Sequence, residues 1–302
     1  MPPRNPVRRG RFAPSPTGPL HPGSLLAAFG SWLLARHAGG EWWIRVEDLD
    51  PPREQPGAIE RQLRTLQAFG FESDGPILYQ SARDAAYRDA LGRLLASGAA
   101  FECWCSRADL ADNGGLHHAC VTGPQAGRTP AVRLRVPQGQ VVAFDDAIQG
   151  RVTQDVGREV GDVVLRRADG FWAYQLAVVV DDAAQGITDV VRGADLLDST
   201  PRQILLQRAL GLPTPDYAHL PLIVDADGRK LSKSMDAAPI DDAAAPLPAL
   251  RWAWRALGQD PAALEACTDV AGTLAAALAG FSPSRVPSES VAMHNTGVAI
   301  AP

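Results

Sequence analysis

The first fifty residues follow the order strand, loop, helix, strand, and this order restricts the folds that the chain can adopt. Residues 11–16 predict a short strand that leads into a Pro- and Gly-rich loop at 14–23. Apolar residues then recur every three or four positions over 24–37, which is typical of a helix, and residues 41–47 are rich in strand formers. Two strands joined through a helix form a βαβ unit, so we predict an α/β fold with a parallel sheet.

Both lysines of the chain, Lys230 and Lys233, lie within one five-residue stretch, 230–234. Every other basic residue, outside the histidines, is an arginine. An ammonium is a compact point charge on a flexible stem, whereas a guanidinium is a broad planar fork. We therefore interpret the stretch as one that brings a point charge up to a phosphate in a crowded pocket.

Composition narrows the protein class. The chain has 302 residues, of which 46% are hydrophobic and 21% charged, which is typical of a soluble globular protein. No apolar run reaches the length of a membrane span, and the start does not resemble a secretory signal. Four cysteines, three of them clustered, favour a reducing compartment and a metal site. We expect a cytoplasmic protein without a membrane partner.

Farther along, helical patterns cover 56–69, 83–97 and 200–210, and strand patterns cover 132–136, 140–144, 163–167 and 220–224. The short strands and turns near the cysteines indicate an insertion between two halves of an α/β domain. Helical patterns return at 248–257 and 261–278, and the last twenty or so residues are expected to be disordered because they are rich in Ser and Pro. The predicted divisions are a first half at 11–100, the insertion at 101–160, a second half at 161–235, and a linker with a short helical tail at 236–302.

A candidate phosphate site lies where the first strand passes into the first helix. A helix N-terminus offers unbonded N–H groups and the positive end of a dipole to an anion. Gly18 and Gly23 permit close approach to the backbone, and His21 can donate a hydrogen bond to a phosphate oxygen.

A candidate metal site combines Cys103, Cys105 and Cys120 with a histidine. Three thiolates and one imidazole make a closed structural zinc site. We predict His117 as the fourth ligand, with His118 as the alternative, and Cys267 as a buried residue outside the site.

Several segments resemble one enzyme family at ordered points. Residues 21–24 and 230–234 resemble the HIGH and KMSKS signatures of class I aminoacyl-tRNA synthetases, and residues 11–18, 45–50 and 181–195 resemble signatures of the glutamyl branch. Ser24 stands where the HIGH signature has its second histidine, and the tail after Ser234 is too short for the anticodon-binding domains of a glutamyl-tRNA synthetase. In both respects the chain resembles the glutamyl-Q tRNA(Asp) synthetases.

The resemblance implies a Rossmann-like class I catalytic domain with a zinc-bearing insertion and a short helical C-terminal tail. It implies that ATP, with Mg²⁺, activates L-glutamate, which is then esterified to the queuosine base in the anticodon of tRNA(Asp). One structural zinc ion and a monomer are expected.

Glutamate carries two carboxylates and one ammonium, so its site needs cations and an anion. We assign Arg192 to the side-chain carboxylate, because bidentate pairing also rejects the amide of glutamine. Glu47 is assigned to the α-ammonium, Tyr174 to a hydroxyl beside Arg192, and Ser15 to the α-amino end. The predicted glutamate-binding residues are Arg11, Phe12, Ala13, Pro14, Ser15, Glu47, Tyr174 and Arg192.

The predicted catalytic residues are His21, Lys230 and Lys233. ATP is expected to contact His21, Gly23, Ser24, Ser232 and Lys233. The lysines would stabilise charge that builds on the phosphoryl oxygens and on departing pyrophosphate.

Three alternative functions stay open from the sequence. They are a shortened glutamyl-tRNA synthetase that charges the 3′ end of tRNA(Glu), a non-catalytic tRNA-binding paralogue, and another nucleotidyltransferase with an HxGH motif. Trp252 or Trp254 could stack on an unpaired base, although core packing is favoured. Candidate tRNA contacts are Arg107, Arg128, Arg133, Arg135, Arg251 and Arg255.

Overall fold

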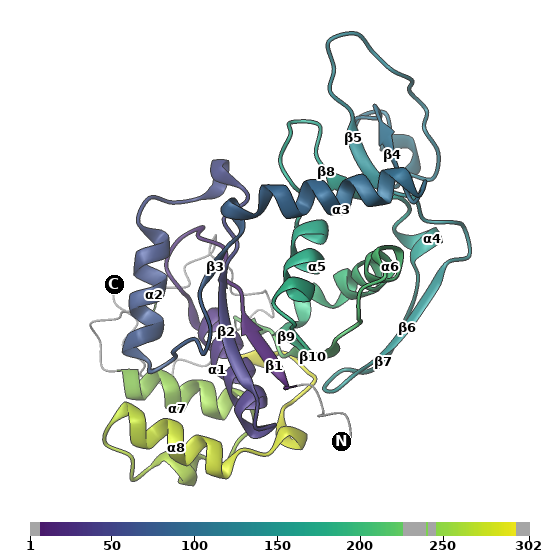
Figure 1. Cartoon of the computed structure of the whole chain (residues 1–302). Coiled ribbons are helices and arrows are strands. Elements are labelled where there is room, and N and C mark those ends of the chain that lie inside the picture. The colour runs from purple at the N-terminus through teal and green to yellow at the C-terminus, as the bar shows by residue number, and fades with distance from the viewer. Residues whose placement is uncertain (1–6, 226–239, 241–245, 294–302) are drawn as a thin grey trace, which may run out of the picture.

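A seven-stranded sheet, with the order β3-β2-β1-β9-β10-β6-β7, forms the centre of the molecule (Figure 1). The computed structural model describes residues 7–225, 240 and 246–293, so the predicted lysine stretch lies outside the described residues. All neighbouring strands of this sheet are parallel except β6 and β7. The strands are β1 (Arg9–Phe12), β2 (Glu41–Val46), β3 (Leu78–Tyr79), β6 (Val141–Asp146), β7 (Gly150–Asp155), β9 (Asp189–Gly193) and β10 (Asp216–Leu220).

The predicted βαβ unit is confirmed. Strand β1 pairs in parallel with β2, and helix α1 (Pro22–His37) connects them and packs on β1, β2 and β9. The α/β class with a parallel sheet is therefore as expected.

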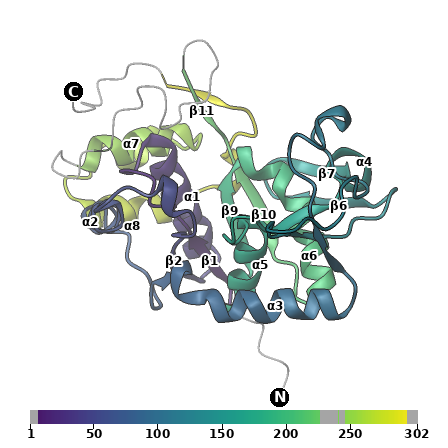
Figure 2. The ribbon, with the colours of Figure 1, turned by 90° about the horizontal axis from the view of Figure 1, so that it is seen from above.

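Helices cover both faces of the sheet (Figure 2). Successive side chains of a strand point to opposite faces, so each buried strand feeds two cores. Val191 and Ala218 join the core beneath α1, whereas Val190 and Tyr217 join the core beneath α5 and α6. Helices α7 and α8 pack on α1, and α3 packs on α5 and α6. The remaining helices are α2 (Ala58–Ala68), α3 (Asp84–Ala96), α4 (Val156–Glu159), α5 (Tyr174–Ala184), α6 (Thr200–Leu210), α7 (Pro246–Ala256) and α8 (Val270–Gly280).

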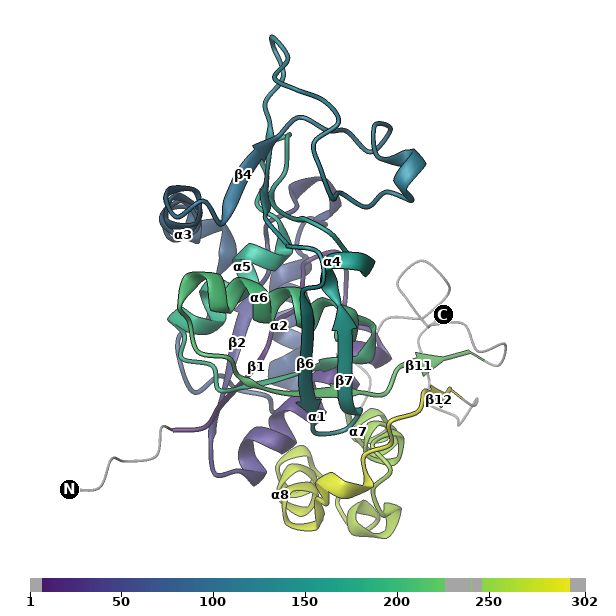
Figure 3. The ribbon, with the colours of Figure 1, turned by 90° about the vertical axis from the view of Figure 1, so that its right-hand side faces the viewer.

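A second, antiparallel sheet stands apart from the main one (Figures 1 and 3). It consists of β4 (Ala100–Cys103), β5 (Ala131–Leu134) and β8 (Val163–Arg166). Sheet membership differs from the sequence expectation, which placed the strand at 140–144 in the insertion and the strand at 163–167 in the second half. Strand β6 instead extends the main sheet, because Val142 and Phe144 bury their side chains in the core beneath α6. The predicted domain boundaries stay a prediction.

Two expectations near the C-terminus were wrong. The strand predicted at 220–224 is two strands, since β10 ends at Leu220 and a separate β11 (Ile223–Val224) follows. The last twenty or so residues were expected to be disordered, but within the described part of this stretch β12 (Val291–Ala292) pairs in parallel with β11, and residues 294–302 lie outside the described residues. The Val291 N–H donates to the Leu222 carbonyl at 2.8 Å. The Met293 N–H donates in the same way to the Val224 carbonyl at 2.8 Å. The strand is only two residues long, too short to show a strand pattern in a Ser- and Pro-rich sequence.

Trp252 and Trp254 are buried in the core beside α1, as the preferred interpretation expected. None of the helices in the described part of the chain has the length and apolar character needed to traverse a lipid bilayer.

Candidate active site and metal cluster

A cavity of about 1010 Å³ opens at the carboxyl ends of β1, β2 and β9. This edge of a parallel sheet is where ligands bind in open α/β folds. The cavity gathers residues from both halves of the main sheet and from α1 and α5. Every predicted glutamate- or ATP-contacting residue within the described chain lines it: Arg11, Phe12, Ala13, Pro14, Ser15, His21, Gly23, Ser24, Glu47, Tyr174 and Arg192.

The Pro- and Gly-rich loop after β1 is held by its neighbours. The Glu47 N–H donates to the Pro14 carbonyl at 2.9 Å. Buried Gln62 of α2 donates through Nε2 to the carbonyls of Ser15, at 3.1 Å, and Gly18, at 2.7 Å. Gly18 has a φ of 134°, a conformation that other residues rarely adopt. The backbone that forms this wall of the cavity is therefore held by hydrogen bonds from within the protein.

His21 is the N-cap residue of α1. Its Nδ1 accepts a hydrogen bond from the Ser24 N–H at 3.3 Å. A neutral imidazole that accepts at Nδ1 carries its proton on Nε2, which is then a donor. A Cβ on Gly23 would lie 3.0 Å from Cε1 of His21, so a glycine lets the ring fold back over the helix end. Gly23 thus supports the cap, whereas the sequence suggested only an approach for a ligand.

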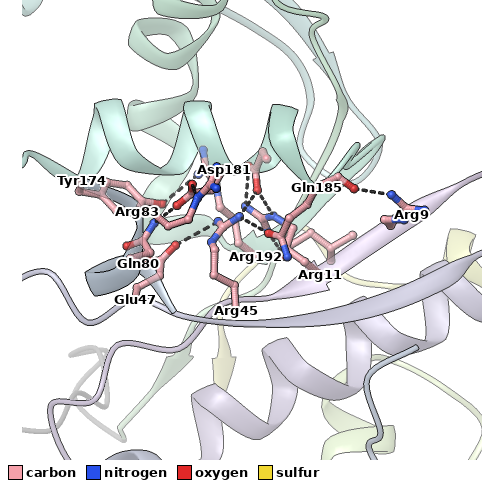
Figure 4. Close-up of polar contacts among 12 residues, drawn as sticks. Arg9, Arg11, Arg45, Glu47, Gln80, Arg83, Tyr174, Asp181, Gln185 and Arg192 are labelled. Atoms are coloured by element: carbon pink, nitrogen blue, oxygen red, sulfur yellow. Dashed lines mark hydrogen bonds and ion pairs between the residues drawn. The ribbon is translucent and has the colours of Figure 1, made fainter. Parts of the chain in front are cut away.

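A network of buried charges adjoins the cavity and includes two of its lining residues, Arg11 and Glu47 (Figure 4). Asp182 of α5 accepts from Nε of Arg11 at 3.0 Å and from Nη1 of Arg45 at 2.6 Å. Arg45 is fully buried and also donates to Glu47 at 3.1 Å. One carboxylate therefore holds two guanidinium groups, and one of these holds the carboxylate of Glu47.

Burial and the arginines act in opposite directions on these acids. Burial alone would raise the pKa of Asp182, but Arg11 and Arg45 outweigh it and lower that pKa. Burial raises the pKa of Glu47 despite the opposing effect of Arg45 and Arg11. Asp182 is thus ionised and balances the charge of the two arginines. A further cation in the cavity would favour the ionised form of Glu47.

Arg192, at the end of β9, is buried and held on three sides. Its Nε donates to Nε2 of His219 at 3.1 Å, and its Nη2 donates to the Thr200 hydroxyl at 2.8 Å. Its Nη1 donates to the Tyr174 hydroxyl at 3.2 Å. Burial raises the pKa of Tyr174, so the phenol keeps its proton. Arg192 and Tyr174 together present hydrogen-bond donors side by side on the cavity wall.

The three clustered cysteines and His117 come together as the sequence predicted. Their ligand atoms all lie within 4.8 Å of one another. The cluster contains His117, the first of the two histidines considered. Its Nδ1 lies 2.8 Å from Oδ2 of Asp162, and its Nε2 lies 3.2 Å from Sγ of Cys103. A carboxylate on one ring nitrogen, with the other turned toward thiols, is the arrangement that orients a metal-binding histidine.

The thiols suit a cation. The Val121 N–H donates to Sγ of Cys105 at 3.3 Å, and backbone hydrogen bonds lower the pKa of Cys105 against the effect of burial. Burial and the nearby Cys103 and Cys105 raise the pKa of Cys120 to about 11. Negative charge on the neighbouring sulfurs thus opposes ionisation of Cys120, and a divalent cation would remove that conflict. The donor set therefore fits a metal ion.

Comparisons with known proteins identify the family. The family described as "tRNA synthetases class I (E and Q), catalytic domain" matches residues 7–269. A glutamyl-Q tRNA(Asp) synthetase from Xanthomonas campestris pv. campestris (strain 8004) is 72% identical over 279 residues, which cover 92% of this chain and 93% of that protein. The chain belongs to the glutamyl-Q tRNA(Asp) synthetases. A relative of the same name from Burkholderia mallei (strain ATCC 23344) is 55% identical over 287 residues, covering 90% of this chain and 95% of the relative.

A solved structure agrees with the assignment of this chain to the class I synthetases. A glutamate tRNA ligase from Elizabethkingia meningosepticum CCUG26117, in complex with its amino acid, superposes with a TM-score of 0.79 at 25% identity. The superposition covers 96% of this chain and 67% of that one. The synthetase therefore has the class I catalytic fold that the sequence implied.

The arginines considered as tRNA contacts of this synthetase lie in different surroundings. Arg107 and Arg133 line the cavity, and Nη1 of Arg133 donates to the Asp162 carbonyl at 3.0 Å. Arg135 lies over the ring of Phe101, and Arg251 donates to three backbone carbonyls in the segment between α7 and α8. Arg251 thus holds the segment between α7 and α8, and a contact with tRNA stays a prediction for all six arginines.

Sequence reasoning gave no role to the residues that hold the predicted site residues. Asp182 was noticed only as part of a signature, and Thr200, His219 and Asp146 were not considered. The signal for His219 was a single polar residue between the buried Ala218 and Leu220. Arg11 and Asp182 come from distant parts of the chain, and so do Asp146 and His219. Their spacing in the sequence therefore could not show that they are in contact.

Proposed function

We propose that this synthetase activates L-glutamate with ATP and transfers it to the queuosine base in the anticodon of tRNA(Asp). The observation that carries the proposal is the meeting of Arg192, Tyr174 and Glu47 in one cavity at the ligand-binding edge of the sheet. The acceptor rests on the relatives, which are named for tRNA(Asp) and for the glutamyl-Q product.

Glutamate would enter with its side-chain carboxylate toward Arg192 and Tyr174. The two donors are already joined at 3.2 Å, so a carboxylate can accept from both without rearrangement. The amide of glutamine would turn an N–H group toward one of these donors, which leaves buried polar groups unsatisfied. The α-ammonium would face Glu47, and its charge would stabilise the carboxylate against the effect of burial.

ATP would lie at the N-terminus of α1. The Nε2–H of His21 would donate to a phosphate oxygen, and Gly23 and Ser24 would contribute their backbone at the helix end. Lys233, with Lys230 and Ser232, would stabilise charge on the α-phosphoryl group and on departing pyrophosphate more than in the ground state. Mg²⁺ would accompany the triphosphate.

The cysteine cluster would hold one structural zinc ion through Cys103, Cys105, His117 and Cys120. Four ligands close the site, so the ion would supply stability rather than a reactive water. It would tie the loop after β4 to Asp162, which lines the cavity. A monomer in the cytoplasm, where reducing conditions keep thiols available, stays a prediction.

The test is transfer of labelled glutamate, in the presence of ATP, to three purified acceptors. These are tRNA(Asp) with queuosine, tRNA(Asp) without it, and tRNA(Glu). Label on the queuosine-containing tRNA(Asp) alone is expected. Label on tRNA(Glu) would replace the proposal with a compact conventional glutamyl-tRNA synthetase, and label on none of them would refute the acceptor.

A further inference from the structure

His219 lies fully buried between a carboxylate and a guanidinium. Its Nδ1 is 2.6 Å from Oδ2 of Asp146, and its Nε2 accepts from Nε of Arg192 at 3.1 Å. The Thr200 hydroxyl lies 3.2 Å from the same Nε2. The three strands involved, β6, β10 and β9, are neighbours in the sheet, so the chain of contacts runs straight across it.

The contacts fix the tautomer of the ring. The guanidinium of Arg192 is always charged and can only donate, so Nε2 must carry a lone pair. The proton then lies on Nδ1 and is donated to Asp146. Oδ1 of Asp146 accepts three backbone N–H groups, from Ile148 at 3.0 Å, Gln149 at 2.9 Å and His219 at 3.1 Å. These bonds hold the carboxylate in place and keep it an acceptor.

The surroundings favour a neutral ring. Burial and Arg192 lower the pKa of His219 against the effect of Asp146. The ring stacks on Tyr217, whose own ring lies beneath the Arg192 guanidinium. A proton on Nε2 would set two donors face to face and push Arg192 away from its present position.

We propose that His219, held as its Nδ1–H tautomer by Asp146, is a positioning and specificity-determining residue for the glutamate side chain. It acts through Arg192, because the bond to Nε leaves Nη1 directed at the Tyr174 hydroxyl and the cavity. A rigid pair of donors accepts a carboxylate and rejects an amide, whereas a loosened guanidinium can adapt to either. This inference rests on the proposed function, since it presumes that glutamate occupies the Arg192 side of the cavity.

Two substitutions of the same residue separate positioning from mere packing. A glutamine side chain reaches as far as Nε2 of histidine, so His219→Gln keeps an acceptor for Arg192 but loses the donor to Asp146. Asparagine reaches only as far as Nδ1, so His219→Asn keeps the donor to Asp146 but leaves Arg192 without its acceptor. Both replace the ring with a smaller amide, so they should lose similar packing.

Asp146→Asn provides a nearly isosteric third variant. The backbone N–H groups on Oδ1 keep the amide oxygen on their side, so the amide nitrogen would donate to Nδ1. The proton of the ring would then move to Nε2, where it opposes Arg192. This change of tautomer, with almost no change of volume, keeps the test available if the His219 variants fold poorly.

The measurements are glutamate-dependent ATP–pyrophosphate exchange, glutamate binding by calorimetry, and thermal unfolding for each variant. We expect His219→Asn and Asp146→Asn to raise KM for glutamate about tenfold or more, as for loss of a hydrogen bond to a charged group. His219→Gln should raise it clearly less, kcat should change less than KM, and discrimination against glutamine should fall in the order of the KM effects.

Each contrary result is distinct. Wild-type protein that uses glutamate, together with equal KM values in the Asn and Gln variants, would overturn the inference and leave the proposed function standing. Losses that follow only the melting temperature would do the same. Wild-type protein with no glutamate-dependent exchange and no glutamate binding would overturn the proposed function itself, and this inference with it.

Discussion

Replacement of Asp182 by asparagine is expected to destabilise the protein strongly, because it removes the one carboxylate shared by Arg11 and Arg45. Both guanidinium groups are buried, with side chains 3% and 0% exposed, and Asp182 is 9% exposed. Oδ1 of Asp182 accepts from both arginines and Oδ2 accepts from Nη2 of Arg11 at 3.4 Å, so the amide keeps one acceptor oxygen but loses the negative charge and turns a donor toward Nη2 of Arg11. Two charges then remain in the interior, with Glu47 in contact with Arg45 and with Asp181 as a further nearby acid.

The magnitude follows from this burial. Loss of one partner from a buried ion pair costs about 3–5 kcal/mol. Unfolding entropy of about 2.1 cal/mol/K per residue gives about 0.6 kcal/mol/K for a chain of 302 residues, so the melting temperature should fall by about 5–8 °C. Glutamate affinity should fall as well, since Arg45 would no longer be held in place beside Glu47.

The effect has a defined pH dependence. Arg11 and Arg45 lower the pKa of Asp182 below its ordinary value of 3.8, against the effect of burial. A depressed pKa in the folded state contributes stability above the unfolded value, and this contribution is lost as the pH falls through the folded value. The difference in melting temperature between wild type and variant should thus be constant above about pH 5 and should shrink below pH 3.8.

Differential scanning calorimetry over a pH series measures this directly. Asp145→Asn is the matched control, since Asp145 pairs with Arg151 at the surface with its side chain 79% exposed, and such pairs contribute little. A shift for Asp182→Asn no larger than that of the control would refute the reasoning. A difference that stayed constant to the lowest pH would refute the ionised state of Asp182.

Two further predictions concern the lysine stretch and the metal cluster. Lys233→Ala should lower ATP–pyrophosphate exchange by about 2.7–4 kcal/mol of transition-state stabilisation. Lys233→Arg should not restore exchange, because a planar guanidinium cannot replace a point charge. Unchanged exchange in the alanine variant would remove the proposed role. Cys120→Ser should abolish stoichiometric zinc in metal analysis of freshly purified, reduced protein and should lower the melting temperature. Cys267→Ser is the control and should keep the metal, since Cys267 lies outside the cluster. A wild-type protein without zinc would refute the assignment.

The start of the fold could be predicted because its signals are local. The period of apolar residues over α1, the strand formers of β2 and the N-terminal His21 all lie within one βαβ unit. The cysteine cluster was also predictable, since its ligands fall within eighteen consecutive positions, from 103 to 120. In both cases neighbours in the sequence are neighbours in space.

The supporting contacts could not be predicted because they join distant segments. Strand β6 lies beside β10, where Asp146 pairs with Tyr217. Nothing in the sequence of either segment indicates this pairing. Asp146 and His219 lie 73 positions apart in the sequence, and Arg11 and Asp182 lie 171 positions apart. A sequence motif identified Arg192 and Arg11 as candidates, but only the tertiary structure shows which side chains hold them.

The central claim is that glutamate goes to a base in the anticodon rather than to the 3′ end of the tRNA. The most direct measurement is transfer of labelled glutamate to tRNA(Asp) from which the 3′-terminal adenosine has been removed, with and without queuosine. The account predicts full labelling of the trimmed tRNA that contains queuosine and no labelling of the trimmed tRNA that lacks it. Loss of labelling on removal of the 3′ adenosine would contradict it.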